Sequence, residues 1–194
     1  LDQPLQPLRT DSIDGLVSGM ATRVQQAQTA ATRVGRPVSP LLSEEAGRLG
    51  DMLNALAPAQ RAQQIARLAD VMPAGMTQAL AQQIDAKDKG LALELALGTS
   101  KTTSGRYTAE WVARGRQAIK DKAIKEDSAA ATGLRAQMAA EVGDALTGKA
   151  REDVIEAARL LYLGQQAGSL SPSVKGAVRL ALGGDLIDYN GKRI

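Results

Sequence analysis

Apolar residues recur at intervals of three and four along most of the chain, and this spacing is typical of amphipathic helices. Proline and glycine interrupt the pattern often enough to keep most of the expected helices to a few turns. The pattern predicts helices from Thr10 or Asp11 to about Val34, from Ser39-Pro40 or Ser43 to about Ala57, from Pro58 through Met72, from Pro73 through Ile84, within Asp85–Gly98, at about 107–124, 128–147 and 150–167, and from Ser171-Pro172 to Leu182.

The run from Leu91 to Leu97 has leucine at alternate positions, and so it could be mistaken for a β-strand. We expect a buried helix instead. Alanine, leucine and glutamate are strong helix formers, and the neighbouring segments are predicted to be helical as well.

A polar loop of Thr, Ser and Lys from Gly98 to Gly105 is the best candidate for a boundary within the chain. It separates an N-terminal helical half, residues 1–98, from a C-terminal helical half, residues 99–194, although one continuous domain also fits the pattern. The first nine residues are expected to form an extended lead-in, and Asn190-Gly191 predicts a β-hairpin in the tail. The residues at the two ends suggest a piece of a longer protein.

The fold class that follows is all-α, with eight or nine helices in an orthogonal bundle or a short solenoid and a small C-terminal β-hairpin. No sequence repeat of fixed period is present. Alanine and leucine dominate the apolar residues, which suits close packing of helices better than a sheet.

Composition excludes several kinds of chemistry. The chain has no Cys, no His and no Phe, with one Trp and three Tyr. Zinc fingers, disulfide frameworks, thiol nucleophiles and Ser-His-Asp triads are therefore impossible, and no cofactor or metal site is predicted. The longest uncharged stretch, residues 160–174, is too short and too polar to span a bilayer. The net charge of +3 is only a small basic surplus.

The most basic stretch, from Lys101 to Lys125, also holds Tyr107 and Trp111. Contact with a nucleic-acid backbone is one hypothesis for it. An ordinary amphipathic helix with Trp111 in the core is the alternative interpretation, and the pattern favours it. The residues that would contact nucleic acid are Lys101, Arg106, Arg114, Arg116, Lys120 and Lys122.

A glycan-cleaving enzyme would need a glutamic acid in an apolar pocket, and Glu94 lies inside an apolar run. A single polar stripe on a helix explains Glu94 equally simply, and the aromatic residues that usually hold sugars are scarce. This hypothesis is the least favoured, and an assay on purified cell wall would settle it.

Two glycine patterns have simple structural explanations. Residues 143–150 match G-x-x-x-x-G-K but end in alanine where a P-loop needs Ser or Thr, so we expect a helix that ends at glycine, followed by a turn. Gly15 and Gly19 form G-x-x-x-G outside any membrane segment. We expect these two glycines, together with Gly47 and Gly50, to permit close helix crossings or simply to weaken their helices.

Several segments resemble parts of the large, Ala-rich internal virion proteins of tailed bacteriophages, a likeness that covers about residues 45–194. The resemblance implies a non-enzymatic structural role in the virion, in assembly or genome ejection, with other virion proteins or a second copy of the chain as partners. It transfers no active-site residue to this sequence. The segments that carry it are Lys89-Gly90-Leu91-Ala92-Leu93, Gly105-Arg106, Glu110-Trp111-Val112-Ala113-Arg114-Gly115, Ala157-Ala158-Arg159-Leu160-Leu161-Tyr162, the run from Ala177 to Gly184 and the run from Asp188 to Arg193.

Overall fold

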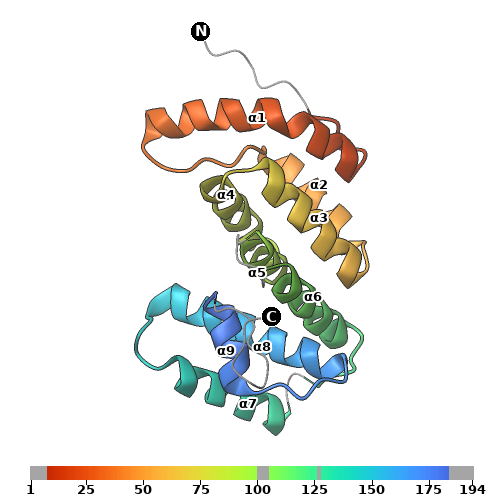
Figure 1. Cartoon of the computed structure of the whole chain (residues 1–194), viewed down its shortest axis with the longest axis vertical. Helices are drawn as coiled ribbons and strands as arrows, with labels where there is room; N and C mark the ends of the chain where they lie inside the picture. Colours follow the sequence, from red (N-terminus) through yellow and green to blue (C-terminus); the bar gives the residue numbers. More distant parts are fainter. Residues whose placement is uncertain (1–7, 100–104, 126–127, 184–194) are drawn as a thin grey trace, which may run out of the picture. The chain divides into compact units, whose positions relative to one another are not determined.

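The computed structural model describes residues 8–99, 105–125 and 128–183, with the side chains at 105 and 106 left out. Within these ranges all regular secondary structure is helical, which confirms the all-α class. The predicted hairpin falls in the tail, outside the described residues. The helices, drawn in Figure 1, are α1 (Ile13–Val34), α2 (Ser43–Asn54), α3 (Pro58–Val71), α4 (Ala74–Asp85), α5 (Lys89–Gly98), α6 (Gly105–Lys120), α7 (Ala129–Val142), α8 (Gly148–Ala167) and α9 (Val174–Ala181).

The chain divides into two compact units, Leu1–Thr99 and Ser100–Ile194. In the N-terminal unit, α4 packs along α5, α3 packs on both α1 and α5, and α2 lies against α4. In the C-terminal unit, α8 packs against α6, α7 and α9, so α8 is the central helix of that unit.

Three predicted helices end earlier than expected, each for a local reason. Helix α2 ends at Asn54 because Ala57, which precedes a proline, adopts an extended conformation with φ −61° and ψ 152°. Helix α6 ends at Lys120, and Lys122 takes a left-handed conformation with φ 55°. Helix α7 ends at Val142, where Gly143 has φ 61°.

The leucine run forms α5, as predicted. Asp88 begins the helix by accepting a hydrogen bond from the backbone N–H of Leu91 at 2.9 Å. Every residue from Leu91 to Leu95 is buried, so the helix is covered on several sides. The alternation of leucine therefore reflects burial of the whole helix and not a strand.

The core of the N-terminal unit is aliphatic, but it also contains two arginines. Arg23 is 2% exposed and Arg61 is 3% exposed, so both long side chains occupy interior space. The apolar side chains of this core that are most deeply buried are Leu16, Met20, Leu49, Leu53, Ile65, Leu68, Leu80, Leu91 and Leu95.

Arg23 of α1 pairs with Glu45 of α2. Its Nη2 donates to Oε1 of Glu45 at 2.8 Å and its Nη1 donates to Oε2 at 3.1 Å, a bidentate arrangement. Arg23 also donates to the carbonyl of Pro40 at 3.3 Å, and Glu45 accepts the N–H of Leu42 at 2.9 Å. This single pair thus joins α1, the loop after α1 and the first turn of α2.

Arg61 of α3 pairs with Glu94 of α5. The Nε of Arg61 donates to Oε2 of Glu94 at 2.7 Å, and the glutamate side chain is fully buried. Because the partners lie on different helices, the pair fixes the position of α3 against α5.

Removing one partner of a buried pair leaves the other charge in the core without its counter-ion. Arg61→Met is therefore expected to lower the free energy of unfolding by about 3–5 kcal/mol in urea titrations followed by circular dichroism. Arg67→Met is the matched control, since Arg67 pairs with Asp14 at the surface, and it should cost less than about 1 kcal/mol. Equal effects of the two substitutions would contradict this role for the buried pair.

Candidate interaction surface

The C-terminal unit is organised around a close crossing of α6 and α8. A Cβ atom added to Gly115 of α6 would clash with the carbonyl oxygen of Leu160 on α8. A Cβ atom added to Gly164 of α8 would clash with the carbonyl oxygen of Trp111 and lie 3.0 Å from the backbone nitrogen of Gly115. The two backbones therefore touch, and only glycine fits at either position.

The crossing is made by Gly115 and Gly164. Gly164 also begins Gly164-x-x-x-Gly168, a match to G-x-x-x-G that sequence reasoning missed. The pattern that was singled out, Gly15 and Gly19, does not face another helix at this distance. A Cβ atom at Gly19 would instead clash with the side chain of Leu8, which lies before α1. The expectation of a close helix crossing at Gly15 and Gly19 is therefore wrong, because the segment before α1 occupies the space. The alternative, that these glycines weaken their helix, stays a prediction.

The close crossing of α6 and α8 determines where the side chain of Trp111 lies. A Cβ atom at Gly168 would lie 2.6 Å from the six-membered ring of Trp111, so the indole packs directly on the backbone at the end of α8. The guanidinium of Arg114 stands over the ring at 5.3 Å from its centroid, within the range of a cation–π contact. Trp111 is only partly buried, so the prediction that it is a core residue is met in part.

Tyr107, Glu110, Trp111 and Arg114 lie on successive turns of one face of α6, and we call this set the α6 surface. Tyr107 is 56% exposed. Arg114 donates from Nε at 3.0 Å and from Nη2 at 2.7 Å to the same oxygen of Glu110, Oε1. The surface therefore combines an exposed phenol, a fixed indole and a neutral acid–base pair.

The structure does not gather the predicted nucleic-acid contacts into one patch. Lys101 is outside the described residues, and the side chain of Arg106 is not described. Arg114 is paired with Glu110 and stacked on Trp111, whereas Arg116 is half-buried and lies about 200° away around the helix. The exposed members are Lys120 and Lys122.

The structure buries Glu94, the predicted acid of a glycan-cleaving site. Its side chain has no exposed surface and is paired with Arg61 in the core of the N-terminal unit. A glycan in solution has no access to the carboxylate in this arrangement. The apolar run that drew attention to Glu94 is the packing of α5.

The match to G-x-x-x-x-G-K is the end of a helix followed by a turn, as predicted. Arg151 donates to the carbonyl oxygens of Gly143 at 3.2 Å and Ala139 at 3.0 Å, and so it caps the C-terminus of α7. Lys149 pairs with Asp153 at 2.8 Å. The lysine that a P-loop would use for phosphate is therefore engaged by a carboxylate of its own helix.

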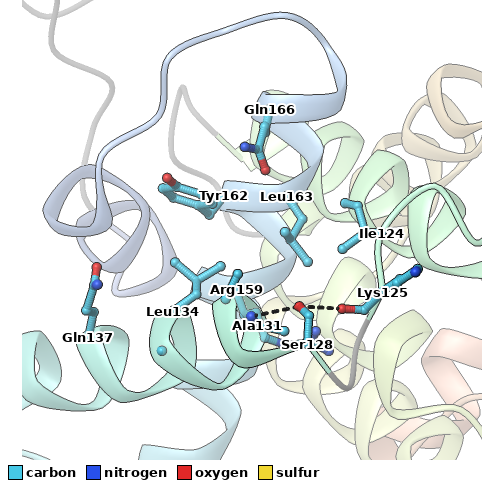
Figure 2. A pocket seen from close by; sticks show the side chains of 12 residues that line it. Ile124, Lys125, Ser128, Ala131, Leu134, Gln137, Arg159, Tyr162, Leu163 and Gln166 are labelled. Atoms are coloured by element: carbon cyan, nitrogen blue, oxygen red, sulfur yellow. Dashed lines mark hydrogen bonds between the residues drawn. The ribbon is translucent and has the colours of Figure 1, made fainter.

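A groove of about 410 Å³ lies between α7, α8 and the turn that follows α6 (Figure 2). Ile124, Leu134, Tyr162 and Leu163 supply most of its apolar lining. At its edge the Oγ of Ser128 donates to the carbonyl of Lys125 at 2.9 Å and accepts the N–H of Ala131 at 3.1 Å, as the dashed lines show. These bonds fix the start of α7 and hence one wall of the groove.

Within residues 8–99, 105–125 and 128–183, no group of three or more Asp and Glu side chains is placed to hold a metal ion. No helix there is both long enough and apolar enough to cross a membrane.

Comparison of the chain with protein families, with curated proteins and with solved structures finds no match.

The α6–α8 crossing makes a sharp prediction for glycine substitutions. Gly164→Ala forces the two backbones apart, and we expect it to lower the free energy of unfolding of this unit by about 1–3 kcal/mol. Gly133→Ala is the control, since a Cβ atom there meets nothing within 4 Å, and it should stabilise α7 by up to about 1 kcal/mol. Thermal unfolding followed by Trp111 fluorescence and circular dichroism measures both. A neutral Gly164→Ala would contradict backbone contact at the crossing.

Proposed function

We propose that this chain is a non-enzymatic interaction domain of a phage or prophage virion protein, active in assembly or genome ejection. In this proposal the α6 surface binds another virion protein or a second copy of the chain. The virion setting rests on the resemblance of residues 45–194 to internal virion proteins. The binding role rests on the α6 surface.

The observation that carries the binding role is the fixed position of Trp111 beside an exposed tyrosine and an arginine. Tryptophan, tyrosine and arginine are the residues most enriched where protein interfaces gain most of their affinity. The indole is held by Gly168 and Arg114, so little side-chain freedom is lost when a partner covers it.

The charge of the α6 surface fits the same role. Glu110 and Arg114 neutralise each other, and next along the helix Gln117 donates to Asp121 at 2.8 Å. Recognition at such a surface depends on stacking, shape and hydrogen bonds more than on net charge. These properties favour a protein partner over a phosphate backbone.

The virion proposal is tested on particles made by the phage or prophage whose genome encodes the chain. Mass spectrometry of purified particles should detect the protein together with capsid and tail proteins. Its absence from particles that contain those proteins would contradict the proposal.

The binding role is tested by substitutions on the α6 surface. Tyr107→Ala combined with Arg114→Ala should lower incorporation of the protein into particles by about tenfold, because both side chains would be buried by the partner. Lys175→Ala, at an exposed position on α9, is the control and should leave incorporation unchanged. Normal incorporation of the double variant would place the binding surface elsewhere.

A nucleic-acid-contacting module is the second candidate, favoured by one observation. Lys120, Lys122 and Lys125 are all exposed, and they are near one another in the sequence, at the end of α6 and in the turn that follows. In this candidate the three lysines contact phosphates.

Salt dependence distinguishes this second candidate. Three phosphate contacts predict an affinity for duplex DNA that falls with a log–log slope of about −3 in salt concentration, measured by fluorescence anisotropy. Replacing Lys120, Lys122 and Lys125 together by Gln should abolish most of that slope, whereas Lys175→Gln should not. No binding at low salt would exclude this candidate.

A further inference from the structure

The segment Leu8–Asp11, which we call the strap, precedes the N-cap residue of α1, crosses α1 and reaches α2. The side chain of Leu8 fills the space over Gly19 that a Cβ atom would otherwise take. The N–H of Leu8 donates to Oε1 of Glu45 at 3.4 Å, and the hydroxyl of Thr10 accepts from Arg48 at 2.6 Å. The strap is therefore seated on both helices at once.

The seat for the strap is built by groups that the strap does not itself position. Glu45 is held by the two hydrogen bonds from Arg23 and by the N–H of Leu42. Gly19 and Arg48 belong to the helices α1 and α2. The notch over Gly19 and the acceptor oxygen thus remain in place when the strap leaves, ready for a segment of the same shape.

The strap is held lightly. Leu8 is partly buried at the edge of the core, and its hydrogen bond to Glu45 is long. Arg9 and Asp11 are largely exposed and 3.9 Å apart, and the bond between Thr10 and Arg48 is also at the surface. Detachment of the strap loses the packing of Leu8, the two hydrogen bonds and the contacts of Arg9 and Asp11 over Gly15. Ser12, which follows the strap, keeps its place as the N-cap of α1 by accepting the N–H of Gly15 at 3.0 Å.

We propose that the seat on α1 and α2 is an interaction surface for the strap of a second copy of this chain. A strap from another molecule carries the same leucine, amide and hydroxyl, so it makes the same contacts that it makes within one chain. When two copies exchange straps, each molecule gives one strap and receives one, so the product is a closed, two-fold symmetric dimer. By mass action, the fraction of molecules in the exchanged dimer increases with protein concentration. This inference uses only the N-terminal unit and does not depend on the proposed role of the α6 surface.

The natural absence of cysteine allows a direct test in the full chain. Thr10→Cys and Arg48→Cys are prepared as separate proteins, mixed at high concentration and treated with a short bismaleimide that spans an arginine side chain. Exchange predicts a cross-linked heterodimer of the two variants that exceeds either homodimer by about fivefold, as resolved by mass spectrometry. The double variant Thr10→Cys/Arg48→Cys, diluted, is the positive control and should cross-link within one chain.

Substitutions that prevent the strap from binding over Gly19 should remove the excess of cross-linked heterodimer. Gly19→Val, placed in the Arg48→Cys protein, puts side-chain atoms where Leu8 sits, and it should reduce the heterodimer to the level of the homodimers. Leu8→Ala, placed in the Thr10→Cys protein, should do the same while leaving every helix residue unchanged. The proposal is overturned if the heterodimer equals the homodimers in the parent mixture, or if it persists when Leu8→Ala is present.

Discussion

Side-chain volume is the constraint on which both units depend. With no phenylalanine and one tryptophan, the chain fills its core with aliphatic side chains and methionine, among which leucine and alanine are the most frequent. Helices that present small side chains leave voids unless they approach closely or another group fills the space between them. In the C-terminal unit, glycine lets the helices approach closely. In the N-terminal unit, large buried side chains fill the space between the helices.

In the N-terminal unit the filling groups are arginines. Arg23 is the largest side chain that is almost fully buried there, and Arg61 is nearly as inaccessible. Burying a guanidinium is unfavourable unless a carboxylate meets it with good geometry, and Glu45 and Glu94 do so at 2.7–2.8 Å. The same pairs restrict which helices can be neighbours, because each buried guanidinium needs a carboxylate from another helix within hydrogen-bond distance. The two ion pairs therefore both fill the core of this unit and determine which helices pack against each other.

In the C-terminal unit, close approach of the helices at glycine makes large core side chains unnecessary. Contact of the backbones at Gly115 and Gly164 brings α6 and α8 close enough that small side chains can fill what remains. The crossing also decides where the only indole of the chain goes. Trp111 packs on Gly168 at the edge of the unit and not inside it, with Arg114 over its ring. A packing requirement thus places a rigid aromatic group at the surface, which is the basis of the proposed interaction.

The sequence by itself determined the helices, because spacing, proline, glycine and N-capping residues act over a few neighbouring positions. The helical nature of residues 91–97 and the turn at Gly143 follow from such local rules. Only the tertiary structure decided which groups meet across long separations. Arg61 and Glu94 are 33 residues apart, and neither residue signals its partner. Of two equivalent glycine patterns, the one at Gly164 meets a helix and the one at Gly15 meets the strap. Local sequence rules cannot distinguish the two glycine patterns, because the difference is which distant segment the fold places against each glycine.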